Sequence, residues 1–207
     1  MHHFRPDELI RRHGIISDQI TINELREILK ELHAVLYRGK PSAVVEFGCY
    51  CGTTSLYLRR VMQLFKIESE LHVYDSFTGL PEKTDLDQSP IGTQFQVGEL
   101  ASSKRTLIRH FAQANLPLPT IHKAWFDDLT ADDLPNSIGF AFLDGDYYHS
   151  IMTPLKLIWP KLTPGAVIVV DDYHNEALPG ASRAVDEWVS AHSLQVKVIH
   201  SLAIIHT

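Results

Sequence analysis

Carboxylates gather at two places in this sequence, in the runs Asp144-Gly145-Asp146 and Asp171-Asp172. Each run directly follows an apolar stretch of the kind that forms a buried strand, at residues 138–143 and 166–170. Four carboxylates at one sheet edge would repel one another in a low-dielectric cleft unless a cation neutralised them. Oxygen ligands suit Mg²⁺, Ca²⁺ or Mn²⁺. The pattern predicts a divalent-metal site beside a substrate; the alternative is solvated loop acids that cap helices.

The residues after three other predicted strands suit a nucleotide-like cofactor. The turn from Gly48 to Gly52 lets a ligand approach the backbone closely, or serves packing alone. It has neither the lysine of a phosphate loop nor the GxGxxG spacing of dinucleotide-binding proteins. Asp75 stands where an acid accepts hydrogen bonds from ribose hydroxyls, or caps a turn. Trp125 and Phe126 would flank a purine ring or pack in the core.

The order of elements needed to bring these residues together is visible in the hydrophobic pattern. Apolar strands alternate with helical segments, which predicts a parallel sheet covered on both faces. The predicted strands are 43–47, 71–74, 120–123, 138–143 and 166–170, and the helices are about 53–65, 100–114, 150–159 and 181–192. A tight turn is predicted at 161–165. Two short strands at 195–199 and 202–206 are too close for a helical crossover, so an antiparallel hairpin is expected.

The fold class predicted is therefore α/β, a Rossmann-like, doubly wound and mostly parallel seven-stranded sheet with a C-terminal hairpin. Residues 1–39 are predicted to form a helical extension, and 40–207 the main domain. Thr21 to Glu24 has the form of a capping box, and apolar residues at helical spacing follow it until Arg38, Gly39 and Pro41. We expect this helix to pack on the main domain; shaping a substrate mouth or a dimer contact is an alternative.

The composition limits the possible partners and location. A net charge of −6, from 19 basic and 25 acidic residues, disfavours a protein that grips a nucleic-acid backbone. Cys49 and Cys51 are too close together in the sequence for a disulfide between them to join distant segments, so a reducing compartment is expected. The N-terminus lacks a signal-peptide core, and no run of roughly 18 apolar residues occurs. A cytoplasmic protein without membrane contact is expected.

These segments together resemble the macrocin O-methyltransferase family. The matching stretches are 45–52, 74–82, 125–126, 143–148, 160–173 and 179–186. Asp75-Ser76-Phe77-Thr78-Gly79-Leu80-Pro81 combined with Leu143-Asp144-Gly145-Asp146 makes the resemblance fairly specific, and it covers about residues 40–190. It implies a class I S-adenosylmethionine-dependent enzyme that methylates a sugar or aromatic hydroxyl with the help of a divalent metal.

The resemblance also implies roles for individual residues. Cofactor contacts would come from Glu46, Gly48, Tyr50, Asp75, Ser76, Trp125, Phe126 and Asp144. Within this set, Asp75 and Ser76 would hold the ribose, and the two aromatic residues would lie near the adenine. Mg²⁺ or a related cation would be bound by Asp144, Asp171 and Asp172, with Asp144 also the candidate general base, while Asp146 would only brace the loop.

Three departures from the family pattern leave the acceptor open. His149 stands where the family usually has Glu, Ala124 stands where Gly is common, and the N-terminal region is short. The expected partner is a small-molecule sugar, diol or catechol, and a homodimer is possible. A cation would make the acceptor hydroxyl more acidic, Asp144 would take its proton, and residues 78–98 would close over the site.

Two other functions fit part of the pattern. A metal-dependent glycosyltransferase would use Asp144-Gly145-Asp146 to hold a nucleotide sugar through Mn²⁺, but it does not explain the glycine turn followed by an acid after the second strand. A non-catalytic cofactor-binding module is the third possibility. The clustered acids disfavour it, because uncompensated charges are costly in a buried cleft.

Overall fold

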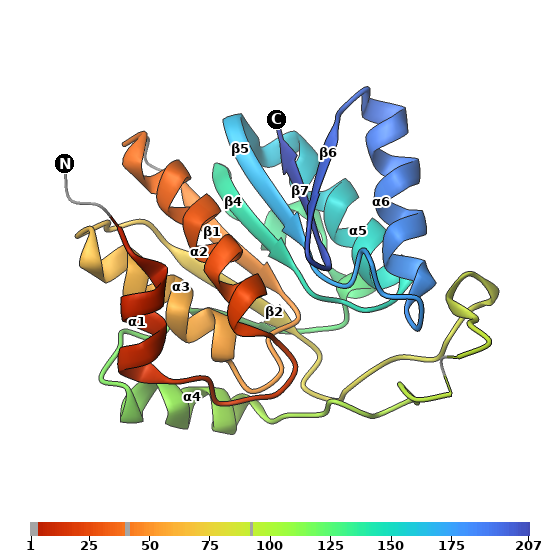
Figure 1. The fold of residues 1–207 in the computed structure, drawn as a ribbon, viewed down its shortest axis with the longest axis horizontal. Helices are drawn as coiled ribbons and strands as arrows, with labels where there is room; N and C mark the ends of the chain where they lie inside the picture. The colour runs from red at the N-terminus through yellow and green to blue at the C-terminus, as the bar shows by residue number, and fades with distance from the viewer. Residues whose placement is uncertain (1–3, 40–41, 92) are drawn as a thin grey trace.

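A seven-stranded sheet forms the centre of the computed structural model, which describes residues 4–39, 42–91 and 93–207. The strand order is β3-β2-β1-β4-β5-β7-β6 (Figure 1). The first five strands in this order are parallel, and β7 runs antiparallel to both β5 and β6. The strands are β1 (Ala43–Phe47), β2 (Leu71–Asp75), β3 (Thr120–Lys123), β4 (Ile138–Leu143), β5 (Leu162–Val170), β6 (Val196–Ile199) and β7 (Leu202–His206). The predicted fold class and C-terminal hairpin are confirmed.

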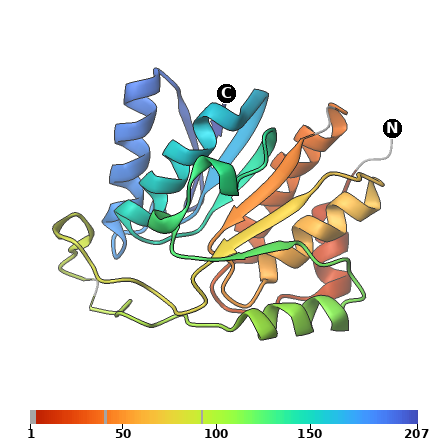
Figure 2. The same cartoon turned by 180° about the vertical axis from the view of Figure 1, so that it is seen from behind.

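Helices cover both faces of this sheet, as Figures 1 and 2 show from opposite sides. They are α1 (Pro6–His13), α2 (Ile22–Tyr37), α3 (Thr53–Leu64), α4 (Lys104–Gln113), α5 (Tyr148–Ile158) and α6 (Pro179–His192). One apolar core lies between the sheet and α2, α3 and α4, and a second lies between the sheet and α5 and α6. Side chains alternate along each strand, so Val44 enters the first core while Val45 and Phe47 enter the second. In the part of the chain that is described, no helix is long and apolar enough to span a bilayer.

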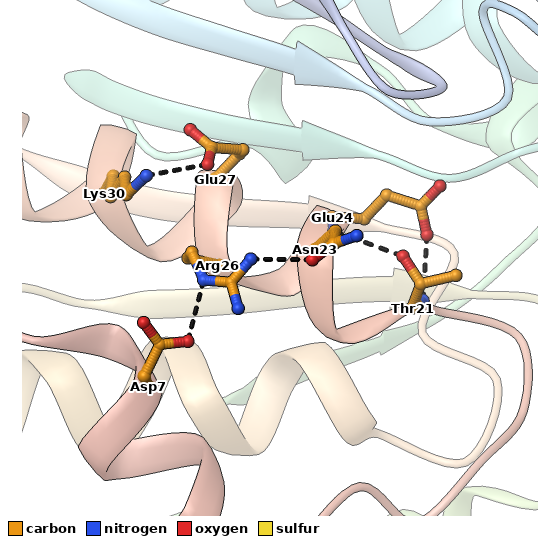
Figure 3. Close-up of polar contacts among 7 residues, drawn as sticks. All are labelled: Asp7, Thr21, Asn23, Glu24, Arg26, Glu27 and Lys30. Atoms are coloured by element: carbon orange, nitrogen blue, oxygen red, sulfur yellow. Dashed lines mark hydrogen bonds and ion pairs between the residues drawn. The ribbon is translucent and has the colours of Figure 1, made fainter.

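The N-terminal extension consists of two helices rather than one helical stretch over residues 1–39. Gly14, with φ of +69°, ends α1, and the capping box begins α2. Thr21 Oγ1 accepts a bond from Glu24 N at 3.2 Å, and Glu24 Oε2 accepts one from Thr21 N at 2.8 Å (Figure 3). Arg26 Nε donates to Asp7 Oδ1 at 2.7 Å and joins the two helices. The apolar side of α2 is buried against the sheet, which confirms its predicted packing.

Parts of these predictions fall on residues outside the described ranges. They are the first three residues of the extension, Lys40 at the proposed domain boundary, and Pro41 as a helix stop. The described part of α2 ends at Tyr37.

Three element boundaries differ from the sequence-based expectation for identifiable reasons. The predicted turn at 161–165 is wrong because β5 already begins at Leu162, which pairs with Ile138 of β4. Gly165 has φ of +81°, and its N–H donates to Thr207 O. The strand therefore continues through Pro164 and Gly165, two residues that usually form turns. Helix α5 begins at Tyr148 rather than Ser150 because Asp87, far away in sequence, caps its first amide. Helix α4 begins at Lys104 because Ser103 accepts a bond from Thr106 N.

Candidate active site

A cavity opens at the carboxyl edge of the parallel strands, where ligands bind in open α/β sheets. Residues at the ends of β1 to β5 form most of its wall, namely Gly48, Tyr50, Asp75, Ser76, Ala124, Trp125, Phe126, Asp144, Gly145, Asp146, Asp172 and Asn175. The long connection from β2 to α4 adds Gly79, Leu80, Pro81, Phe95 and Leu100, and the segment between α1 and α2 adds Asp18 and Gln19. Most of the predicted site residues therefore share one cavity.

The glycine turn after β1 lies directly against the strand end that carries Asp144. A Cβ on Gly48 would lie 1.9 Å from the carbonyl oxygen of Asp144, and φ at Gly48 is +84°. Asp144 N donates to Phe47 O at 2.8 Å, which fixes the same two strand ends. No residue with a side chain fits at position 48 without moving the backbone. The glycine turn and the strand end that carries the acids are thus packed directly against each other.

Asp75 organises this turn. Its Oδ2 accepts bonds from Cys49 N at 2.8 Å and from Tyr50 N at 3.2 Å, and its Oδ1 accepts one from Phe77 N at 2.7 Å. The turn-capping alternative for this residue is therefore present in the structure. Asp75 also lines the cavity beside Ser76, and a carboxylate oxygen has further lone pairs to offer a ligand.

Glu46, a predicted cofactor contact, is absent from the described cavity wall, and its contact with the cofactor stays a prediction. Its side chain is fully buried behind the turn, where it accepts a hydrogen bond from Ser55 Oγ in the first turn of α3. The second oxygen, Oε1, has no hydrogen-bond partner. Burial raises the pKa of Glu46 to about 8, and the charge of Asp75 adds to the effect. Glu46 thus supports the turn from inside the protein.

This burial has a consequence for stability. A carboxyl whose pKa is raised in the folded state stabilises the protein below its unfolded pKa, and this stabilisation is lost as the pH rises through the folded pKa. For Glu46 the window runs from about 4.5 to about 8. In Glu46→Gln the amide does not ionise, so we expect its unfolding temperature to fall less between pH 5 and pH 8 than that of the wild type.

The measurement is thermal unfolding at several pH values. The matched control is Glu68→Gln, which removes an exposed carboxylate between α3 and β2. An equal change of slope in both variants would refute the assignment to Glu46.

Three carboxylates form the acid cluster of this cavity: Asp144, Asp146 and Asp172. One oxygen from each lies within 4.8 Å of the others. Burial raises the pKa of Asp144 well above its usual range, and the charges of Asp171, Asp146 and Asp172 add to this shift. Burial and the charges of Asp172 and Asp171 act in the same direction on the pKa of Asp146. Three hard oxygen donors at this spacing fit a divalent cation, which would relieve their repulsion.

Asp146, rather than the predicted ligand Asp171, is grouped with Asp144 and Asp172 in the structure, and the predicted set of metal ligands stays a prediction. Asp146, expected only to brace the loop, belongs to the acid cluster. Asp171, expected to bind metal, lies outside it: its Oδ1 accepts bonds from Asp172 N at 2.8 Å and Ser201 Oγ at 3.1 Å. Ser201 also bonds to Glu24 Oε1 at 2.5 Å, so Asp171 is directed toward the start of α2. Asp172 follows it in a left-handed conformation, with φ of +55°, and of the two residues only Asp172 lines the described cavity.

The aromatic pair after β3 combines both roles considered from the sequence. Trp125 lines the cavity with 42% of its surface exposed. Phe126 also lines the cavity, but it packs edge-on against Phe47, with 5.4 Å between ring centroids, and so joins the core. Phe47 in turn stacks on Tyr74 at 4.4 Å. The exposed face of Trp125 is thus the one free to stack on a ligand.

Several cavity residues had no signal in the sequence. Asp18 and Gln19 reach the cavity only because α1 folds back beside α2, and Asn175 reaches it through the loop after β5. Asn175 Nδ2 donates to Asp172 Oδ1 at 2.8 Å and orients that carboxylate. His149 and His174 are exposed and lie outside the described cavity wall.

The fold and this cavity define the class of protein. Over 90% of this chain and 80% of the other, the structure matches that of the O-methyltransferase NovP with a TM-score of 0.79 and 23% identity. It matches the calicheamicin methyltransferase CalS11 over 99% of this chain and 94% of the other, with a TM-score of 0.70 and 19% identity. The fold is the Rossmann-like methyltransferase fold. The sequence profile of the macrocin-O-methyltransferase (TylF) family matches residues 15–204, and the chain belongs to this family.

Two similar relatives are named as O-methyltransferases of particular small molecules. Mycinamicin III 3''-O-methyltransferase of Micromonospora griseorubida is 25% identical over 194 residues, which are 89% of this chain and 75% of the relative. Demethyldecarbamoylnovobiocin O-methyltransferase of Streptomyces niveus is 25% identical over 175 residues, 82% of this chain and 66% of the relative. The chain thus spans about two thirds to three quarters of their lengths. The predicted resemblance and the predicted class, S-adenosylmethionine-dependent O-methyltransferases, are confirmed.

Proposed function

We propose that this protein transfers a methyl group from S-adenosylmethionine to a hydroxyl of a sugar-bearing or phenolic small molecule, with a divalent cation held by the acid cluster. The observation that carries the proposal is the contact of Gly48 with the Asp144 carbonyl, which joins the glycine turn to the acid cluster. A methyl donor in the turn and a hydroxyl beside the acids would then lie next to each other. In-line transfer depends mainly on such positioning.

The cofactor side of the proposal uses the turn and the ends of β2 and β3. Gly48 and Tyr50 would face the methionine part, Asp75 and Ser76 the ribose, and Trp125 the adenine, since all of them line the cavity. A solved relative in fold, the Podospora anserina methyltransferase PaMTH1, is described as bound to S-adenosylhomocysteine and matches with a TM-score of 0.61 at 12% identity. The same cofactor class is our proposal for this chain.

The acceptor side uses the acid cluster and the apolar wall. A bound Mg²⁺ or similar cation would supply positive charge that lowers the pKa of a neighbouring hydroxyl. Asp144 is the proposed proton acceptor, because it lies between the glycine turn and the other two acids. Leu80, Phe95 and Leu100 line the same cavity, and they would exclude water from the reacting groups.

Removal of the metal should affect the proposed acceptor site but not the proposed cofactor site. With EDTA, we expect methyl transfer to a panel of demethylated glycosides and catechols to stop and to return with Mg²⁺ or Mn²⁺. The affinity for S-adenosylmethionine, measured by calorimetry, should stay nearly unchanged, because Asp144 is the one predicted cofactor contact that belongs to the acid cluster. Full turnover in the chelator would exclude a role for the metal. Loss of cofactor affinity would show that the cation belongs to the cofactor pocket instead.

The two alternatives from the sequence remain experimentally distinct. Membership of an O-methyltransferase family favours methyl transfer over glycosyl transfer, and a thermal-shift comparison of S-adenosylmethionine with nucleotide sugars tests this preference. A non-catalytic module would bind the cofactor but methylate no acceptor in the panel. The cytoplasmic location and the homodimer stay predictions from the sequence.

A further inference from the structure

A buried carboxylate outside the acid cluster fastens the long connection between β2 and α4. Asp87 is only 1% exposed. Its Oδ2 accepts bonds from Thr84 N at 3.0 Å and Thr84 Oγ1 at 2.6 Å, within the connection. Its Oδ1 accepts a bond from Tyr148 N at 2.7 Å. Tyr148 is the first residue of α5, so Asp87 caps this helix from a distant part of the chain.

The helix that Asp87 caps begins directly after the acid run of β4. Asp146 itself has φ of +64°, a left-handed conformation that a residue with a side chain adopts only when its surroundings enforce it. The next two residues are both bonded to the connection. Tyr147 Oη donates to Phe95 O at 2.6 Å, and Tyr148 N donates to Asp87. The backbone of Asp146 is therefore held from its C-terminal side by the connection.

Helix α6 leaves space for this contact at a glycine. A Cβ on Gly180 would lie 2.0 Å from Asp87 Oδ1 and 2.5 Å from Tyr148 N. Two further bonds hold the connection nearby: Arg183 donates to Leu86 O, and Ser89 Oγ donates to Glu176 O at 2.7 Å. An apolar cluster of Leu80, Tyr147 and Leu178 closes the same junction. The connection thus packs against the N-terminal ends of both α5 and α6.

We propose that Asp87 is a positioning residue that holds Asp146 in the acid cluster, so that cation affinity depends on the connection that forms the cavity wall. This inference rests on the proposed function for the cation. Without Asp87, the first amide of α5 would be buried without an acceptor, and such a group is costly. The turn at Asp146 would relax to restore a partner, and its carboxylate would leave the cluster. Residues that support metal ligands typically change metal affinity by about 10–100-fold when removed.

The test compares three variants of the full chain by their affinity for Mn²⁺ alone. Asp87→Ala should weaken Mn²⁺ binding about 10–100-fold and lower kcat more than it changes KM for the acceptor. Asp87→Asn should recover most of the affinity, because its amide oxygen can still accept from Tyr148 N. Asp85→Ala removes an exposed carboxylate from the same short turn and should bind Mn²⁺ like the wild type. Affinity for S-adenosylmethionine should be the same in all three.

Gly180→Ala provides a second route if Asp87→Ala fails to fold. It leaves every charge in place but pushes a methyl group into the Asp87 contact, so Mn²⁺ affinity should fall as well. Unchanged Mn²⁺ affinity in a folded Asp87→Ala protein, or an equal loss in Asp85→Ala, would overturn the inference. Methyl transfer by the wild type is scored separately. Its absence would overturn the proposed function, while Mn²⁺ affinity would still decide the role of Asp87.

Discussion

Asp144→Asn is expected to lower the rate of methyl transfer about a thousandfold, roughly 4 kcal/mol in the barrier, and at the same time to stabilise the metal-free protein. The amide keeps the shape of the side chain but removes both the negative charge and the ability to accept a proton. Asp144 lies in the acid cluster and against Gly48, so its loss affects cation binding and proton transfer together. The same charge is unfavourable for folding when no cation balances it.

The stability effect has a defined pH dependence. Burial and the neighbouring charges of Asp171, Asp146 and Asp172 raise the pKa of Asp144 in the folded protein. Its contribution to stability is therefore fully present below the ordinary range of aspartate and is lost as the pH rises toward the folded pKa. We expect the gain in unfolding temperature from Asp144→Asn, measured in EDTA, to be larger at pH 8 than at pH 5.

The experiment needs both measurements on the same variant. Asp132→Asn is the control, since Asp132 is an exposed carboxylate in the segment before β4. A wild-type rate in Asp144→Asn would rule this residue out as the base. An unfolding temperature below that of the wild type in EDTA would show that Asp144 stabilises the apo fold, contrary to the expected repulsion among the acids.

The sheet was predictable because each strand carries its own signal. Runs such as 138–143 are apolar throughout, as strands buried on both faces must be, and β4 has these bounds in the structure. The boundaries that failed depend on partners far away in sequence. The start of α5 is set by Asp87, and the start of β5 by pairing with Ile138 despite the local Pro164-Gly165 turn signal. Hydrophobic periodicity contains no information about such tertiary contacts.

The site, like the sheet, could be predicted from local sequence patterns but not in the details that depend on tertiary contacts. Reading the residues after each strand brings Asp75, Trp125 and Asp144 into one cavity, because parallel strands end at a common edge. Which of the carboxylates faces the cavity depends on the backbone angles of individual residues. Asp146 and Asp172 both have a left-handed backbone conformation, with φ of +64° and +55°. Residues other than glycine rarely adopt this conformation, so the sequence does not predict it at these two positions. The sequence therefore located the acids, while the choice of Asp171 over Asp146 as a cation ligand stays a prediction.

Asp146→Asn is expected to weaken Mn²⁺ binding about 100-fold, whereas Asp171→Asn should weaken it by about tenfold or less. The first change removes a charge from the cluster of three oxygens. The second removes one whose oxygen is already committed to Ser201 and to the amide of Asp172. Burial and the charge of Asp172 raise the pKa of Asp171, so its negative charge is unfavourable before any cation binds.

Calorimetric titration of Mn²⁺ into both variants at pH 7 decides between the two assignments, with Ser201→Ala as the informative third protein. Loss of the Ser201 hydroxyl frees Asp171 without removing any charge. If Asp171 only supports the cluster, Ser201→Ala should leave Mn²⁺ affinity near that of Asp171→Asn. A larger loss in Asp171→Asn than in Asp146→Asn, combined with tighter binding in Ser201→Ala, would mean that the cation draws Asp171 away from the start of α2. In that case the original assignment of Asp144, Asp171 and Asp172 as ligands would hold, and Asp146 would be free to accept the acceptor's proton.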